Sequence, residues 1–235
     1  MAVAAVVALA LFFGAAGVIY RDVIDTSQTM TLNASPGRTN TEATLVDYQA
    51  LAGGWRVIDG STAGYRVRER FAHTSADHTA SAETSQVTGS MTLVDGADGP
   101  EVSGATMNVA LAGLRSVDQL AGHRATSRDP IASAALGASR HPDATFTIDE
   151  PIVLPSRLPE DQPADLVVPG RLTLNGRTQT VDSSLRAAID GERLLVVAGS
   201  IETDMTDFGI TPPQRSFVTV RTAVAIDFML RLAPA

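Results

Sequence analysis

The residues with chemically useful side chains do not form a recognisable catalytic set. The tripeptide at 207–209, Asp-Phe-Gly, is the one with which protein kinases hold magnesium, but the chain has no Lys and no H-R-D motif. Residues 60–64 have the outline of a nucleophile elbow, but the central residue is Thr62 and the segment begins a predicted strand. No acid–base pair is identifiable among Asp182, Glu202, Asp204 and Asp207. We therefore expect a protein that is not an enzyme.

Metal and covalent chemistry are also poorly supported. The chain has no Cys, which removes disulfides, thiolate nucleophiles and iron–sulfur clusters. The missing Lys removes a Schiff-base lysine. The four histidines have no standard metal-ligand spacing and are His73, His78, His123 and His141. We predict no metal and no cofactor.

Three cationic or titratable residues stand close together in a predicted crossover between strands. They are His123, Arg124 and Arg128, which could meet a phosphate or another polar head group at the mouth of a barrel. The alternative is that they are solvated surface groups. The whole chain carries a formal net charge of -8, which argues against sequence-independent binding to nucleic acid.

The elements that would position such residues are mostly strands. Residues 218–232 alternate between an apolar face and a face with Arg221, Asp227 and Arg231. At about 3.4 Å per residue this run reaches roughly 50 Å, which is typical of a curved sheet or barrel in which one strand serves two neighbours. The apolar face is Val218, Val220, Thr222, Val224, Ile226, Phe228, Leu230 and Leu232, and it should point inward.

About eight antiparallel strands are expected, so the fold is mainly β, a sandwich or a closed barrel. The strongest hairpin signal is Asn175-Gly176. We expect a loop or a weakly paired edge at 73–85, and two short helices near 116–123 and 131–139. The strands are predicted at 55–58, 61–71, 87–93, 107–111, 144–149, 168–174, 177–189, 194–203 and 218–232.

The N-terminus is expected to be a transmembrane helix. Residues 2–20 are uncharged and mostly apolar, and as a helix they span about 28 Å, close to the thickness of the hydrocarbon core. The alternative is a secretory signal that is cleaved near 14–17, where the residues are small. We divide the chain into an anchor or signal segment at 1–20, a polar tether at 21–53 and a barrel domain at 54–233.

Five stretches, in this order, resemble the YceI-like family of lipocalin-like barrels. The first is 55–67, with the pattern W-x-V-I-D-x-S-x-A-x-Y-x-V, and the others are 87–89 (V-T-G), 141–146 (H-P-D-A-T-F), 169–176 (P-G-R-L-T-L-N-G) and 207–210 (D-F-G-I). The closing apolar strand matches too. The family's Arg-Asp pair stands one position late, as Arg128-Asp129, and the aromatic residue usual after the second short helix is replaced by 136–138, Leu-Gly-Ala.

The resemblance implies an antiparallel eight-stranded lipocalin-like barrel with a short helical crossover. It also implies an apolar ligand in the lumen, for which a polyisoprenoid is the leading candidate. The inward residues predicted to bind it are Tyr65, Val67, Phe71, Met107, Phe146, Phe208, Val224, Ile226 and Phe228, with Arg124 and Arg128 near the polar head.

Two function classes remain open from the sequence. The first is a binding or carrier protein for a long-chain lipid, anchored in the cell membrane by a single span with the barrel outside the cytoplasm, or secreted after cleavage. The second is a structural or stress-related module whose aromatic residues fill the barrel. A hollow interior distinguishes the first class from the second.

Overall fold

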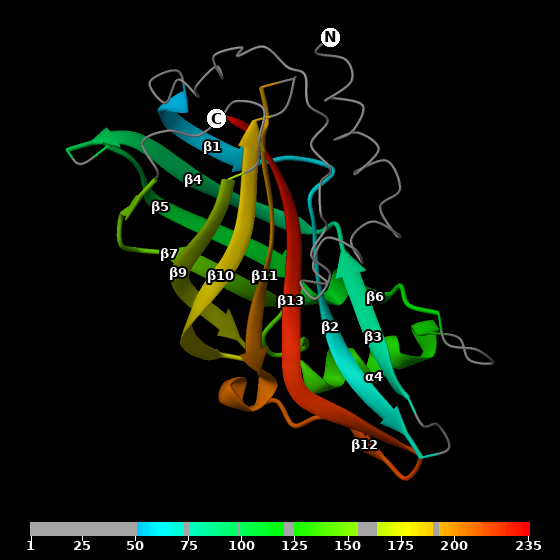
Figure 1. Cartoon of the computed structure of the whole chain (residues 1–235). Helices are drawn as coiled ribbons and strands as arrows, with labels where there is room; N and C mark the ends of the chain where they lie inside the picture. The colour runs from blue at the N-terminus through cyan, green and yellow to red at the C-terminus, as the bar shows by residue number, and fades with distance from the viewer. Residues whose placement is uncertain (1–50, 73–75, 98, 120–124, 155–163, 190–192) are drawn as a thin grey trace, which may run out of the picture.

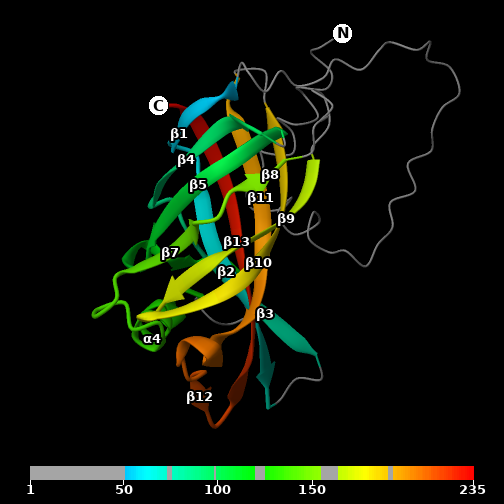
Figure 2. The same ribbon diagram turned by 90° about the vertical axis from the view of Figure 1, so that its left-hand side faces the viewer.

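A computed structural model describes residues 51–72, 76–97, 99–119, 125–154, 164–189 and 193–235. Eight antiparallel strands close into a barrel, because β1 pairs with β4 on one side and with β13 on the other (Figures 1 and 2). In barrel order they are β1 (Gly53–Val57), β4 (Val87–Gly96), β5 (Gly99–Ala110), β7 (Asp143–Ile148), β9 (Ala164–Leu174), β10 (Arg177–Ile189), β11 (Leu195–Asp204) and β13 (Val218–Pro234). The predicted closed antiparallel barrel is confirmed.

The long C-terminal strand β13 is the spine of the fold. It pairs with β11 over much of its length, and its other edge pairs first with β2 (Thr62–Phe71) and then with β1. The register with β2 shifts between Val220 and Val224, which marks an irregularity where the strand bends. This pairing with several neighbouring strands agrees with the length predicted for the strand.

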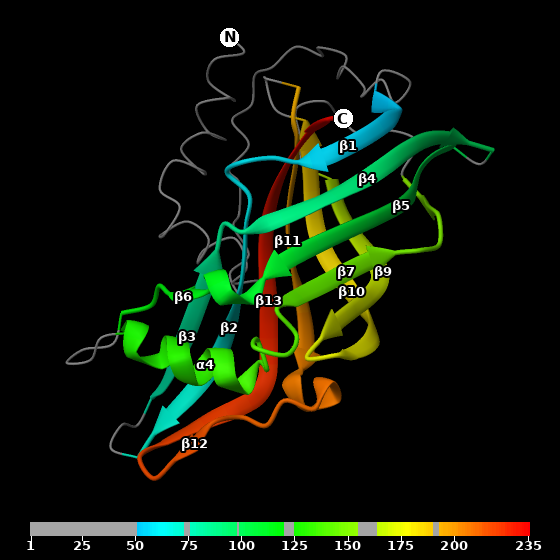
Figure 3. The same ribbon diagram turned by 180° about the vertical axis from the view of Figure 1, so that it is seen from behind.

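The sheet continues past the barrel on the β2 side. β3 (Asp77–Thr84) pairs with β2, and the short β6 (Arg115–Ser116) pairs with β3 (Figure 3). The prediction of a loop or weak edge over 73–85 is therefore wrong for 77–84. Its inward residues include only Ala80, Ala82 and Thr84, which are too small to give a strong apolar alternation in sequence. Two further short strands are β8 (Ile152–Val153), beside β5, and β12 (Gln214–Arg215), beside β13.

The helical crossover differs from the prediction in detail. A 3₁₀ turn at Ala125–Arg128 leads into α4 (Asp129–Ala135), where Pro130 is in the first turn and Gly137, with φ of 66°, follows the end of the helix. The helix predicted at 116–123 is wrong for 116–119. There the chain is extended or irregular, and the Val117 amide donates to the Ser81 carbonyl at 3.0 Å.

The tight turn between β9 and β10 is confirmed. Asn175 and Gly176 both have positive φ, at 50° and 72°, as a two-residue hairpin loop of this type requires. Two further 3₁₀ turns lie at Leu111–Gly113 and Met205–Phe208.

None of the helices in the described ranges is long and apolar enough to cross a membrane. The predicted anchor at 1–20 and nearly all of the predicted tether lie outside the described residues.

Candidate functional site

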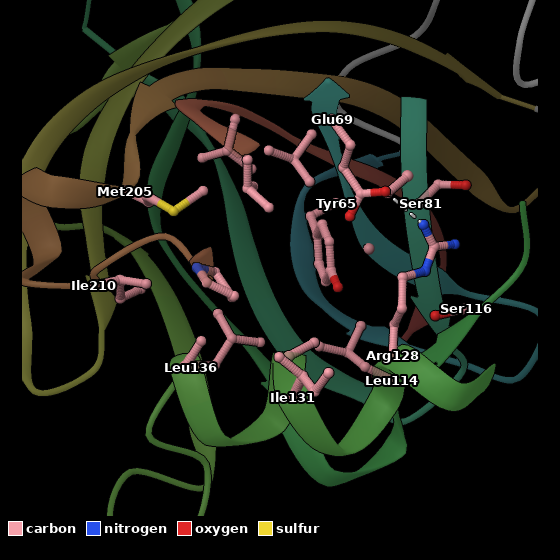
Figure 4. Close-up of a pocket in the computed structure, with 18 of the residues that line it drawn as sticks. Tyr65, Glu69, Ser81, Leu114, Ser116, Arg128, Ile131, Leu136, Met205 and Ile210 are labelled. Carbon is pink, nitrogen blue, oxygen red and sulfur yellow. Dashed lines mark hydrogen bonds and ion pairs between the residues drawn. The ribbon is translucent and has the colours of Figure 1, made fainter. Parts of the chain in front are cut away.

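A cavity of about 320 Å³ lies between α4 and the strands β2 and β13 (Figure 4). Its apolar wall combines inward residues of both strands with one side of the helix. Members from the three elements are Val67, Phe71, Val224, Ile131, Ala135 and Leu136. The period-two pattern of the strands and the turn spacing of the short helix place these side chains on one surface.

A second cavity, of about 210 Å³, lies inside the barrel and is lined mainly by β4, β5 and β7 on one side and by β9, β10, β11 and β13 on the other. Its lining is apolar except for Ser183 on β10. The Ser183 side chain is almost fully buried, and its Oγ has no hydrogen-bond partner among the described residues.

The two cavities share four lining residues, which we call the waist: Ala63, Val109, Ala144 and Ile226. Two of the four are alanines, so little side-chain volume separates the cavities. The two apolar spaces are therefore neighbours inside one barrel, with these four residues at the boundary between them.

Most of the predicted ligand-binding residues line these spaces. Tyr65, Val67, Phe71, Val224 and Arg128 line the first cavity. Met107, Phe146 and Phe228 line the second, and Ile226 belongs to the waist. The structure thus brings together residues from four strands and one helical turn that are far apart in the sequence.

Phe208 is the exception, and its predicted place in the lining is wrong. It lies in the 3₁₀ turn Met205–Phe208, is 0% exposed, and packs in the core cluster with Leu174 and Ile210 without lining either cavity. Its carbonyl accepts a hydrogen bond from the Asn175 side chain at 3.1 Å, which joins this turn to the β9–β10 hairpin. Arg124 and His123 lie outside the described residues.

One wall of the first cavity carries an ion-pair network. Arg128 donates from Nη1 to Glu69 Oε2 at 2.9 Å and from Nη2 to Asp118. Asp118 also accepts from the Ser81 amide at 3.1 Å and pairs with His78 Nε2 at 2.7 Å. The side chains of Glu69 and Asp118 are only 9% and 8% exposed, so these charges are held away from water.

The charged groups of the network shift one another's pKa values. Burial alone would raise the pKa of Asp118, but hydrogen bonds from Arg128, the Ser81 amide and His78 outweigh it and lower the pKa below its usual value. Burial likewise opposes the charge of Arg128, yet Asp118 and Glu69 raise its pKa. Both groups therefore stay charged at neutral pH.

Tyr65 stands beside this network with its ring in the first cavity (Figure 4). Burial raises the pKa of its phenol to about 12, and nearby Arg128 only partly offsets this effect. At neutral pH Tyr65 is thus a neutral hydroxyl that can donate or accept a hydrogen bond.

One residue of this network can be recognised from the sequence. Glu69 falls on the apolar parity of its strand, with Tyr65, Val67 and Phe71, and an acid at an inward position needs a partner. His78 and Asp118 carry no comparable local signal, because 40 residues separate them. Within the described residues, no group of His, Asp and Glu could hold a metal ion.

Comparison with known proteins points in one direction. The sequence model of the YceI-like domain matches residues 58–232. No curated protein matches the chain at a significant level.

Among solved structures, a polyisoprenoid-binding domain from Saccharophagus degradans, implicated in plant cell wall breakdown, is similar with a TM-score of 0.54 and 13% identity, over 78% of this chain and 99% of that one. Burkholderia cenocepacia BcnA has a TM-score of 0.46 and 16% identity, over 73% and 96%. A Campylobacter jejuni YceI protein has a TM-score of 0.40 and 12% identity, over 87% and 98%. At these identities the likeness to the first structure supports the fold alone.

The family match covers most of the chain, and the barrel with its helical crossover agrees with it. The chain belongs to the family of proteins with a YceI-like domain.

Proposed function

We propose that this protein binds a long-chain apolar lipid, of the polyisoprenoid class, with its tail running from the first cavity through the waist into the second. The observation that carries the proposal is the pair of adjacent, largely apolar spaces inside one barrel, which share the four waist residues. The first alone falls within the roughly 300–1,000 Å³ range of small-molecule sites. Each CH₂ that leaves water contributes about 0.8 kcal/mol, so such a lining can hold a tail without polar chemistry.

The choice of ligand class is supported by the relatives. A polyisoprenoid is a slender, branched hydrocarbon, and the domain from Saccharophagus degradans that shares this fold is described as binding one. The hollow interior also argues against a filled structural module, which was the alternative function class.

We propose that the ligand enters between α4 and the β12–β13 hairpin. Ile131 and Phe217 line the first cavity at this place and are 37% and 52% exposed, so apolar side chains reach solvent at the rim. A tail that enters here would replace water on these groups as it slides inward.

We further propose that residues 1–20 hold the protein at the cell membrane, as a single span, with residues 21–53 as a tether and the barrel outside the cytoplasm. The anchor would keep the cavity close to a lipid source. Secretion after cleavage of this segment is the alternative. We propose no catalytic role, because the polar lining residues provide no nucleophile activated by a neighbouring base.

The waist allows a direct test of the binding mode. In Ala144→Phe the added ring would block the passage, because Ala144 lines both cavities. We expect the variant to bind geraniol, a ten-carbon isoprenoid, within about threefold of the unmodified protein, but geranylgeraniol at least ~10-fold more weakly.

Binding would be measured by equilibrium dialysis, and co-purifying lipids by native mass spectrometry. Asp143→Phe, at the exposed neighbouring position in β7, is the matched control and should bind both alcohols normally. Equal loss of both alcohols in Ala144→Phe, or no loss of either in a folded variant, would contradict a tail threaded through the waist.

A further inference from the structure

Most of the polar residues of the first cavity are gathered on one side of it. Tyr65, Glu69 and Arg128 line this side, together with Ser81 and Ser116, whereas the wall formed by α4 and the far part of β13 is apolar (Figure 4). A lipid with its tail in the waist and second cavity would place its polar head against this cluster. This step rests on the proposed function.

The cluster contains a cation, but its charge is already matched. Arg128 gives one donor to Glu69 and another to Asp118, so two carboxylates face one guanidinium. His78 pairs with the same Asp118 oxygen that accepts from Arg128. Asp129 adds a third carboxylate next to Arg128, and it is held by the Ser116 amide at 3.0 Å and the Ser116 hydroxyl at 2.7 Å. Whether or not His78 carries a proton, the three carboxylates outnumber the cations of this group, so its formal charge is negative.

A second observation concerns Tyr65. Its side chain is half-buried and lines the cavity. As a neutral phenol it is suited to an uncharged oxygen atom, to which it can donate or from which it can accept. The polar face thus offers a hydrogen bond without offering an available positive charge.

We infer that the lipid head bound here is uncharged, bearing a hydroxyl or carbonyl oxygen that hydrogen-bonds to Tyr65, and that the carboxylates of Glu69 and Asp118 reject heads that carry phosphate. A phosphate would have to lose its water beside these carboxylates while Arg128 remains engaged by them. Arg215 also lines the cavity, but it is exposed on β12 at the rim, where solvent screens its charge.

The test compares two lipids that have the same hydrocarbon tail and different head groups. Geranylgeraniol and geranylgeranyl phosphate would be measured by equilibrium dialysis against the full-length protein at one fixed detergent concentration. One unbalanced charge about 8 Å from the phosphate, at an effective dielectric constant of about 20, corresponds to roughly 30-fold in affinity. We expect the alcohol to bind at least ~10-fold more tightly than the phosphate, since solvent at the mouth reduces the full effect.

Glu69→Gln supplies the second arm, because the amide oxygen can still accept from Arg128 while one negative charge is removed. In this variant the ratio of the affinity for geranylgeraniol to the affinity for geranylgeranyl phosphate should fall by at least ~3-fold, mainly because the phosphate binds more tightly. Glu202→Gln removes the same charge from an exposed position on β11 and should leave the preference unchanged. If Glu69→Gln does not fold, as judged by its thermal transition, Asp118→Asn serves the same purpose.

The outcomes separate the two ideas. Equal or tighter binding of the phosphate by the unmodified protein would overturn the uncharged-head inference and leave lipid binding in place. An unchanged preference in folded Glu69→Gln would also overturn it, because the carboxylate would then not be the source of the selectivity. Binding of neither compound would instead contradict the proposed function itself.

Discussion

At the scale of single residues, buried polar groups are what distinguish this interior from a plain apolar core. Ser61 and Ser183 are both almost fully buried, at 2% and 1% exposed, but their surroundings differ. The Ser61 hydroxyl donates to the Ile58 carbonyl at 2.8 Å and accepts from the Arg231 amide at 3.0 Å. Ser183 faces the second cavity without a hydrogen-bond partner among the described residues. A buried hydroxyl without a partner costs free energy, whereas a satisfied one stabilises.

This contrast predicts opposite results for the same substitution. Ser183→Ala should leave the free energy of unfolding unchanged or raise it by up to ~1 kcal/mol, because it removes a polar group that has no partner. Ser61→Ala should lower the free energy of unfolding by about 1–3 kcal/mol, because it leaves the Arg231 amide without its acceptor. Urea unfolding of the lipid-free protein would measure both. Equal losses in the two variants would show that the Ser183 hydroxyl is satisfied in solution.

At the scale of elements, β13 shows how one strand separates two environments. Its inward residues Val224 and Ile226 line the cavities, while Asp227 faces the other side, where it is buried and paired with Arg66 at 3.0 Å between Oδ1 and Nη2. The alternation predicted from the sequence therefore describes the facing of these residues. It does not describe their burial, since a charged residue on the outer face is as enclosed as its apolar neighbours.

Substitutions on β13 should depend on which face they occupy. Ile226→Asp would place a carboxyl group at the waist without a partner, and we expect the free energy of unfolding to fall by about 3 kcal/mol and lipid retention to be lost. Thr219→Asp, at an exposed position of the same strand, should change the free energy of unfolding by less than about 0.5 kcal/mol. Thermal unfolding and native mass spectrometry would test this. A folded Ile226→Asp protein that still retains lipid would contradict the position of the waist.

At the scale of the whole molecule, the two cavities lie in parts of the barrel that are built differently. The pairing of β1 with both β4 and β13 closes the part that holds the second cavity. Around the first cavity, β2 takes the place of β1 beside β13, β3 pairs with β2, and α4 completes the wall. This arrangement gives one chain an apolar compartment and a separate polar face.

The N-terminal segment predicts where the whole protein resides. The full-length chain should sediment with membranes and resist a carbonate wash, because residues 2–20 are uncharged and long enough to span a bilayer. Removal of residues 1–20 should release it to the supernatant. The mass of the purified protein distinguishes a retained anchor from a cleaved signal, and a full-length chain released by carbonate would contradict the anchor.

The sequence alone determined the strands, their facing and the hairpin at Asn175-Gly176, since these follow from local periodicity and from backbone conformations that few residues adopt. It also placed most of the lining residues. It did not determine β3, whose small inward side chains give a weak pattern, or the place of Phe208 in a 3₁₀ turn outside the lining.

Only the tertiary structure decided that the interior is hollow and that one wall is polar. Empty volume depends on how inward side chains from every strand of a closed barrel fit together, and no local pattern encodes that sum. The network needs Glu69 and Arg128, 59 residues apart, and His78 and Asp118, 40 residues apart, to meet across β2, β3 and the crossover. Folding of the whole chain brings these groups together on one wall of the first cavity.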